Sequence, residues 1–528
     1  MAPRVVAAVL ALVAALGAWC VVTLGLGFND ELQLQDPAIA RSRPAIVDPR
    51  TPRLSQRVIL VMVDGLRLDH SRQAGFDAVR TLGVDAAAGS HYPTVSRPNY
   101  ITLLTGTPPI ASGIRHNRVR TPLRLDSIMT RAKAAGLRVT TASDIGNIPP
   151  LFITTPVTEL GSLEHPQVGD LITPAAGYAW PFDEVRKAES LAGLEQSLAT
   201  VLARPSDLVI VLAGDVDRAG HAYGAASAQY REAAVAVGAA IGRLVTQLDL
   251  TKDTLIITAD HGHVDRGGHG GREPEALAVP LLIAGAGIVP GAQAPTARLV
   301  DVAPTISALL GIPAPGHGYG RALVELLREA PAAATARTTA DATRLAAVRS
   351  FPDDDAGVDV VVLVVTGGLL VLAIILALAL RPAIAIRRGS WVGVLAFLCI
   401  VAALAAATRG RLSPSEVPAL WRLQRLLAVC GGAAIAIQVV ASWHVVRAFA
   451  NRLSISNGIA LVALSISLGT VFIVRGYLPV PHVDVPEPAW LVAIPAVEIA
   501  AAVSCVAVTL HLIFELVVSV RGTDDHGR

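Results

Sequence analysis

Long apolar segments lie at both ends of this chain of 528 residues and enclose a polar region, residues 29–357. A helix that crosses a membrane needs ~20 apolar residues. The first apolar segment, Val5 to Phe28, is long enough, and we expect an uncleaved anchor over residues 1–28. A cleaved signal peptide is the alternative, although its apolar core is usually only ~7–15 residues long. Five further spans are expected at about 358–380, 390–408, 426–446, 457–475 and 489–517.

The arginines between these segments predict how the chain crosses the membrane. Short loops rich in Arg or Lys stay in the cytoplasm, and the arginines that follow this rule are Arg381, Arg387, Arg388, Arg447, Arg452, Arg521 and Arg528. Both termini are therefore expected inside the cell and residues 29–357 outside it. One loop with four arginines, residues 409–425, disagrees. The prediction is a multi-pass protein of the cell membrane.

This topology divides the chain into four parts after the anchor. They are an extracytoplasmic domain at 29–328, a linker at 329–357, a five-helix transmembrane domain at 358–520 and a cytoplasmic tail at 521–528. Charged residues make up 16% of the chain and the net charge is +2, so no nucleic-acid-binding surface is expected. All four cysteines fall inside apolar segments, which excludes disulfides, cysteine-held metals and a cysteine nucleophile between residues 30 and 355.

The polar region has the pattern of an α/β domain. Short apolar runs typical of buried strands occur at Arg57–Val63, Leu137–Ala142, Leu208–Ala213, Leu255–Ala259 and Pro280–Ala284. Alanine-rich stretches with helical spacing, such as Ala225–Leu248, lie between them. This alternation predicts a mostly parallel sheet flanked by helices.

Three of the expected strands end directly in acidic residues. Asp64 follows the first, Asp217 lies just after the third, and Asp260 with His261 follows the fourth. Ligands of open α/β sheets bind beyond the carboxyl ends of the strands. One such ending often only caps a helix, but three in one domain indicate a single polar site at one edge of the sheet.

The segment Thr258-Ala-Asp260-His261-Gly-His263-Val-Asp-Arg-Gly-Gly-His269-Gly-Gly is the densest cluster of possible metal ligands. Carboxylate oxygen and imidazole nitrogen are the ligands that zinc takes when cysteine is absent. Asp217 and His221, four residues apart, can both point at one cation. Manganese accepts similar ligands and remains an alternative to zinc. The residue count suffices for two divalent ions, which can clamp both reacting oxygens of a phosphoryl group.

A serine precedes the helix expected in His91-Tyr-Pro-Thr-Val-Ser96-Arg-Pro98-Asn99. Pro98 suits the first turn of a helix. Ser96 would then lie at the helix N-terminus, where backbone N–H groups favour an anion. A hydroxyl there can attack phosphorus when a metal lowers its pKa. The alternative is a plain N-cap serine, which is the commonest reason for serine at this place.

Five segments in order resemble the alkaline phosphatase superfamily, most closely its type I phosphodiesterase / nucleotide pyrophosphatase branch and the GPI ethanolamine phosphate transferases. YPTVSRPNYITLLTG is similar to the nucleophile segment of that branch. TADHGHVDRGGHGG is similar to the metal-binding segment of the transferases, and VDVAPTISALLGIPAPGHGYGRAL looks like the closing segment of the family. The resemblance covers residues 57–325 and implies an alkaline-phosphatase-like α/β fold.

The resemblance also implies roles for individual residues. The first metal ion would be bound by Asp64, Asp260, His261 and the bridging nucleophile Ser96. The second would be bound by Asp217, His221 and His269. Asn99 would donate a hydrogen bond to a non-bridging phosphoryl oxygen.

Three departures from the family pattern bear on these roles. Ser96 stands where the branch usually carries Thr, which keeps the hydroxyl. His263 stands where the family often has Met, so it is either a supporting group or merely solvated. The arginine that sulfatases carry shortly after the nucleophile is absent, which disfavours a sulfatase.

Together these features predict a membrane-bound two-metal phosphoric-diester hydrolase or phospho-group transferase. Its expected partners are a lipid- or glycan-linked phosphoester and membrane lipids. Glu498, with His511 and Glu515 nearer the cytoplasmic end, is a candidate functional group inside the last span. The alternatives are a phosphomonoesterase of the same superfamily, a catalytically dead binding protein, and a channel or transporter with an outer domain.

Overall fold

The computed structural model describes residues 39, 42–73, 75–114, 117, 123, 125–145, 171–172 and 181–349. These residues belong to one compact unit, Leu32–Asp354. The expected anchor and the five expected C-terminal spans, with Glu498, lie outside the described residues. Within the described ranges, no helix combines the length and apolar character that a membrane crossing requires.

An eight-stranded sheet forms the centre of the domain, in the order β2-β8-β7-β1-β6-β3-β5-β4. The strands are β1 (Arg57–Val63), β2 (Gly83–Gly89), β3 (Val139–Ser143), β4 (Leu171–Ile172), β5 (Glu184–Lys187), β6 (Leu208–Ala213), β7 (Asp253–Thr258) and β8 (Ala278–Gly285). The five consecutive strands β7, β1, β6, β3 and β5 are parallel. β8 is antiparallel to both of its neighbours, and β4 is antiparallel to β5. The predicted α/β sheet is confirmed, and its five central strands are parallel as expected, whereas the antiparallel pairing of β2, β8 and β4 was not predicted.

The predicted strands match the observed ones best at the centre of the sheet. β1 and β6 have the predicted bounds, because strands covered on both faces are continuously apolar and easy to recognise. β2 has the sequence GVDAAAG and was not predicted, since small residues give little strand signal. The reason for its composition is tertiary: a Cβ atom at Gly83 would lie 1.9 Å from the Ile283 carbonyl oxygen of β8.

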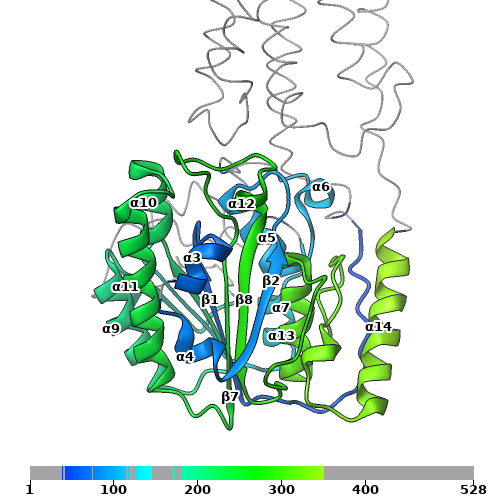
Figure 1. Cartoon of the computed structure of the whole chain (residues 1–528). Helices are drawn as coiled ribbons and strands as arrows, with labels where there is room; N and C mark the ends of the chain where they lie inside the picture. Colours follow the sequence, from blue (N-terminus) through cyan, green and yellow to red (C-terminus); the bar gives the residue numbers. More distant parts are fainter. Residues whose placement is uncertain are drawn as a thin grey trace, which may run out of the picture. The chain divides into compact units, whose positions relative to one another are not determined.

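Helices cover both faces of the sheet (Figure 1). On one face lie α3 (Leu68–Gln73), α4 (Asp77–Arg80), α9 (Leu191–Leu202), α10 (Asp215–Tyr223) and α11 (Ala228–Val245). On the other lie α5 (Ser96–Thr105), α7 (Ile128–Ala134) and α13 (Val302–Leu310). The short helices α6 (Pro109–Ser112) and α12 (Pro274–Leu277) follow α5 and precede β8, respectively. The 3₁₀ helices are η3 (Leu299–Asp301) and η4 (Val324–Leu326).

The final described helix, α14 (Pro331–Arg349), lies within the segment 329–357 that was predicted as a linker. It has no apolar stripe, yet it packs on the domain through buried charged groups. Arg344 donates hydrogen bonds to Asp341 Oδ1 and to the Gly320 carbonyl oxygen, each 2.6 Å long. Hydrophobic spacing does not reveal a helix held in this way.

Candidate metal centre

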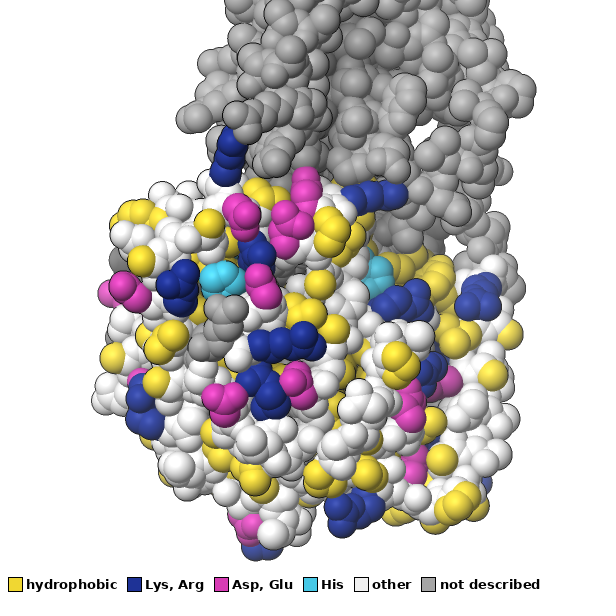
Figure 2. Space-filling model, viewed as in Figure 1, with side chains coloured by type: hydrophobic (Ala, Val, Ile, Leu, Met, Phe, Trp, Pro, Cys, Tyr) yellow, Lys and Arg dark blue, Asp and Glu magenta, His cyan; other side chains and the backbone are white. Residues whose placement is uncertain are grey.

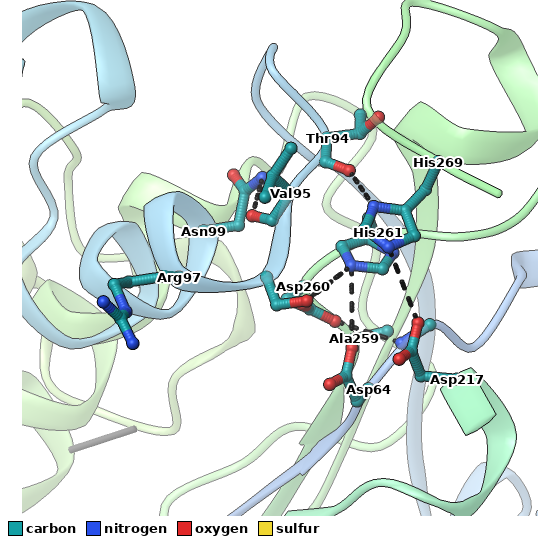
Figure 3. Close-up of polar contacts among 12 residues, drawn as sticks. Asp64, Thr94, Val95, Arg97, Asn99, Asp217, Ala259, Asp260, His261 and His269 are labelled. Atoms are coloured by element: carbon teal, nitrogen blue, oxygen red, sulfur yellow. Dashed lines mark hydrogen bonds and ion pairs between the residues drawn. The ribbon is translucent and has the colours of Figure 1, made fainter. Parts of the chain in front are cut away.

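The acidic side chains that follow three neighbouring strands meet at one edge of the sheet. β1 lies between β7 and β6. Asp64 directly follows β1, Asp217 lies in the first turn of α10 after β6, and Asp260 with His261 follows β7. Figure 3 shows Asp64, Asp217 and Asp260 arranged around the imidazole of His261. The arrangement follows from the parallel pairing of the three strands, whose carboxyl ends share one edge.

The first set of candidate ligands is Asp64, Asp260 and His261, all of them buried. His261 Nε2 lies 3.2 Å from Asp260 Oδ2 and 3.6 Å from Asp64 Oδ1. The hydroxyl of Ser96 reaches the same nitrogen, with Oγ 3.1 Å from His261 Nε2. The four residues that the family resemblance assigns to one ion therefore converge on a space of a few ångströms.

The second set contains Asp217, His221 and His269. His269 Nε2 lies 3.1 Å from His221 Nε2 and 3.7 Å from Asp217 Oδ1, and His221 Nε2 lies 3.4 Å from the same oxygen. The two sets adjoin each other, because the rings of His261 and His269 stack with their centroids 3.8 Å apart. The structure thus brings together all seven residues that the sequence analysis proposed as metal ligands.

Backbone carbonyls orient two of these imidazoles for coordination. His261 Nδ1 lies 3.1 Å from the Gly262 carbonyl oxygen and His269 Nδ1 lies 2.7 Å from that of Thr94. Because a carbonyl oxygen only accepts, Nδ1 carries the proton in both rings. Nε2 is then left with a lone pair that faces the carboxylates, which is the usual arrangement of metal-binding histidines.

The electrostatics of the centre favour bound cations. Burial, together with the charges of Asp217 and Asp260, raises the pKa of Asp64 well above its ordinary value. Burial and the charge of Asp217 raise the pKa of Asp260 to about 7. Asp64 Oδ1 and Asp260 Oδ2 are also buried without a hydrogen-bond partner among the described residues. Buried, mutually repelling carboxylates with unused oxygens fit divalent cations, which supply the missing positive charge.

The imidazoles of His261 and His269 are neutral, as metal coordination requires. Burial lowers the pKa of His261 well below its ordinary value and lowers that of His269 to about 4. Burial alone would raise the pKa of Asp217, but the hydrogen bond from His263 holds it below its usual range. The residues present therefore fit two metal ions, and Asp and His ligands suit zinc best.

Ser96 is the first residue of α5, and the N-cap position is occupied by Val95. A plain N-cap role for Ser96, the alternative considered from the sequence, does not hold in this structure. All ten residues of α5 are buried. The helix therefore holds the Ser96 hydroxyl at a fixed place beside His261, with the backbone N–H groups of its first turn nearby.

Asn99 lies on α5 close to Ser96 but is engaged elsewhere. Its Nδ2 donates to the carbonyl oxygens of His91, Pro93 and Val95 at 3.0, 3.0 and 3.2 Å, and the side chain is fully buried. Figure 3 shows the bond to Val95. These bonds hold the loop that leads into α5 and leave no amide hydrogen of Asn99 directed at a substrate. The oxyanion role expected for it stays a prediction that this geometry does not favour.

A different amide side chain lies at the start of α5. Asn117 Oδ1 accepts a hydrogen bond from the Arg97 backbone N–H at 2.9 Å, and Asn117 is exposed. Figure 3 shows the Arg97 side chain pointing away from the carboxylates, so only its backbone faces this end of the helix. The sequence analysis missed Asn117, because it is separated from Ser96 by α5 and α6 and no short motif connects them.

The centre is open to solvent on one side. The His221 side chain is 52% exposed, whereas that of His261 is fully buried. Figure 2 shows one face of the domain, on which acidic and basic side chains lie interspersed among hydrophobic ones. A substrate can therefore approach from the His221 side, while the Asp64 and Asp260 side is enclosed by the sheet and α5.

Known proteins resemble this chain in sequence over about half of its length. The human GPI ethanolamine phosphate transferase 1 is 24% identical over 320 residues, which cover 52% of this chain and 33% of that protein. The catalytic subunit of human GPI ethanolamine phosphate transferase 2 is 24% identical over 304 residues, covering 53% and 29%. The chain thus spans about a third of the length of these curated relatives.

Solved structures give weaker likenesses. Human ectonucleotide pyrophosphatase / phosphodiesterase 5 has a TM-score of 0.41 at 15% identity, covering 52% of this chain and all of that one. The alkaline phosphatase PafA has a TM-score of 0.39 at 13% identity, covering 52% and 99%. A model of a protein family also matches part of this chain. The resemblance read from the sequence motifs is confirmed, since residues 58–270 match the model of the Type I phosphodiesterase / nucleotide pyrophosphatase family.

Proposed function

We propose that this chain is a two-metal phosphoric-diester hydrolase or phospho-group transferase that uses Ser96 as its nucleophile. The observation that carries the proposal is that the two ligand sets adjoin through the stacked rings of His261 and His269, 3.8 Å apart, with Ser96 Oγ 3.1 Å from His261 Nε2. Two divalent cations, when bound, would supply positive charge beside the attacking hydroxyl and the leaving oxygen. The match of residues 58–270 to a phosphodiesterase family supports the same chemistry.

Ser96 would carry the phospho group between donor and acceptor. Its oxygen forms a bond to phosphorus while the bond from phosphorus to the leaving alcohol breaks, and the alcohol departs with a proton. A second hydroxyl then attacks the phosphoserine and restores Ser96. Water as the acceptor makes a hydrolase, and an alcohol makes a transferase.

The N-terminus of α5 would hold the non-bridging phosphoryl oxygens. The helix dipole favours an anion at this point, where the Ser96 N–H lies. The Arg97 and Asn99 N–H groups already donate to Asn117 Oδ1 and to the Val95 carbonyl oxygen, and Pro98 has no N–H. Asn117 is the side-chain amide best placed to assist, since it already contacts the Arg97 N–H beside Ser96. We assign the oxyanion role to these groups in preference to Asn99, whose amide hydrogens are bonded within the loop.

The relatives suggest the class of substrate. Two GPI ethanolamine phosphate transferases are among the curated proteins that match this chain, each over slightly more than half of its length. We therefore propose a phosphoethanolamine-type transfer, or hydrolysis, on a lipid- or glycan-linked phosphoester. The expected membrane spans would place such a substrate at the bilayer and the domain outside the cytoplasm, in the cell membrane.

The experiment compares an aryl phosphodiester, an aryl phosphomonoester and an aryl sulfate with the full-length protein in detergent. Zinc or manganese is added in parallel, and a chelator serves as the control. We expect the diester to be preferred and its turnover to be lost on chelation. Preference for the monoester would contradict the proposal in favour of a phosphatase, and turnover that survives chelation would contradict the metal centre.

A matched pair of variants tests the nucleophile. Ser96→Ala removes the hydroxyl and is expected to reduce turnover by about a thousand-fold or more, with the bound metal content unchanged. Ser96→Thr keeps the hydroxyl and is expected to retain measurable turnover. If Ser96→Ala turned over at a near-normal rate, Ser96 could not be the nucleophile. Addition of a phosphoethanolamine lipid and an alcohol acceptor to the wild type distinguishes transfer from hydrolysis by the product formed.

A further inference from the structure

We propose that His263 is a positioning residue, which holds the Asp217 carboxylate ready for a divalent cation without binding that cation itself. The inference rests on the metal centre proposed above. His263 belongs to a group with Asp217, His261 and His269 whose candidate ligand atoms all lie within 4.8 Å of one another. Proximity alone would make it a fourth ligand, but its hydrogen bonds argue for a different role.

Both ring nitrogens of His263 are already in use. The Gly268 backbone N–H donates to Nδ1 at 3.2 Å, so Nδ1 carries the lone pair in the neutral ring. Nε2 must then carry the proton, and it lies 2.8 Å from Asp217 Oδ1, to which it donates. The ring has no lone pair left to offer a metal on the side that faces Asp217.

The neighbouring imidazoles have the opposite tautomer. His261 and His269 each donate from Nδ1 to a backbone carbonyl oxygen, which leaves Nε2 as an acceptor. The three histidines thus divide into two that present a lone pair and one that presents a proton. A proton directed at a ligand carboxylate is what the supporting groups of metal sites supply, since it fixes the orientation of the carboxylate.

Two glycines make room for the His263 ring. A Cβ atom at Gly220 would lie 2.6 Å from His263 Cδ2 and Nε2, and one at Gly65 would lie 2.9 Å from the same two atoms. Gly220 lies inside α10, between Asp217 and His221, where glycine costs about 1 kcal/mol relative to alanine. The space that the His263 ring occupies between Gly220 and Gly65, called the slot below, leaves no room for a side chain at Gly220. The ring fills this slot and is fully buried.

The test measures metal binding by the full-length protein, with metal content by elemental analysis and zinc affinity by competition with a chelator. His263→Gln keeps an N–H that can reach Asp217, and we expect two zinc ions per chain and an affinity within about three-fold of wild type. His263→Met fills the slot without the donor. We expect it to bind two ions at saturating zinc, with one of them weakened roughly ten- to a hundred-fold.

A pair of glycine variants tests the same role without changing His263 itself. Gly220→Ala should displace the ring and weaken the same site as His263→Met does. Gly242→Ala is the matched control, because an added Cβ at Gly242 in α11 would meet no atom within 4 Å beyond its own helix backbone, and it should leave zinc affinity unchanged.

Three results would overturn the inference. Loss of one ion per chain from both His263→Gln and His263→Met at saturating zinc would make His263 a direct ligand. Affinities equal to wild type in His263→Met and Gly220→Ala would leave it no positioning role. A wild-type protein that binds no divalent cation would contradict the proposed function and this inference together. The first two results, in contrast, would contradict only the role of His263.

Discussion

The residues of the centre are arranged for a bound cation, and this arrangement lowers the stability of the metal-free protein. Asp64, Asp217 and Asp260 lie close together, and two of them are fully enclosed at the carboxyl edge of the sheet. In the absence of positive charge, the folded chain must either keep repelling carboxylates or hold a proton on one of them. The raised pKa values of Asp64 and Asp260 express this conflict.

The metal-free protein should therefore be stabilised by Asp260→Asn at neutral pH. The pKa of Asp260 is about 7 in the fold against 3.8 when unfolded, so the fold favours the protonated carboxyl. This stabilisation is complete below about pH 4 and is lost as the pH rises through 7. In a chelator at pH 8, we expect the variant to exceed wild type by on the order of 2–4 kcal/mol. At pH 4 the two should be alike. Urea unfolding at both pH values measures this.

Zinc should reverse the order in the same experiment. The wild type gains stability from binding, whereas Asp260→Asn lacks a ligand and gains less. An Asp260→Asn protein that is less stable than wild type in chelator at pH 8 would show that the carboxylates do not repel each other in the fold.

At the scale of elements, α5 links the nucleophile to the rest of the domain. Ser96 begins the helix, and Gly106 ends it with a φ of 72° and an N–H that donates to the Thr102 carbonyl oxygen. The Gly106 carbonyl oxygen in turn accepts from the Tyr319 N–H at 2.7 Å. The left-handed turn at Gly106 therefore sets how the far end of α5 joins the loop before η4.

Gly106→Ala should destabilise the protein by about 2–4 kcal/mol. About 1–2 kcal/mol comes from a side chain in the left-handed region. The remainder comes from crowding, because the added Cβ would lie 3.1 Å from the Val300 carbonyl oxygen and 3.2 Å from Gly318 Cα. Gly136→Ala is the control, since Gly136 has a similar φ of 74° but open space around it. Equal losses in the two variants, measured by denaturant unfolding, would rule out the crowding.

At the scale of the whole described unit, buried charged side chains hold the last helix, α14, against the rest of the domain. Arg344 of α14 is almost fully buried and donates to the carbonyl oxygens of Gly318 and Gly320, on either side of Tyr319. Because Tyr319 contacts the end of α5, the hydrogen bonds form one path from α14 to the nucleophile helix. The segment predicted as a linker thus contacts the loop that holds the far end of α5.

Arg344→Met should lower the free energy of unfolding by about 3–5 kcal/mol, because it leaves Asp341 buried without its cationic partner. Arg243→Met is the control, since its bond to Glu195 is on the surface and its loss should not be measurable. Denaturant unfolding of both variants decides the point. A change in Arg344→Met no larger than in Arg243→Met would show that α14 is held in another way.

Much of the site was predictable because its residues lie next to recognisable strands. β1 and β6 are almost continuously apolar, β7 contains a shorter apolar run, and acidic groups follow each strand within a few residues. Parallel pairing then places Asp64, Asp217 and Asp260 at one edge without further information. Local spacing also singled out Ser96, His221 and His269, the family resemblance implied their roles, and the structure places all three in the same cluster.

Only the tertiary structure decided the features that depend on contacts between distant segments. Asn117 lies beside the start of α5, Asn99 is bonded within its own loop, and β2 pairs with β8 through a glycine that nothing local requires. Likewise, the proton of His263 is assigned by Gly268 and Asp217 from two different segments. The sequence by itself determined which residues follow the strands, because periodicity and local order are written along the chain. Hydrogen bonds and close approaches join residues far apart in it, so the fold alone settles which side chain each group faces.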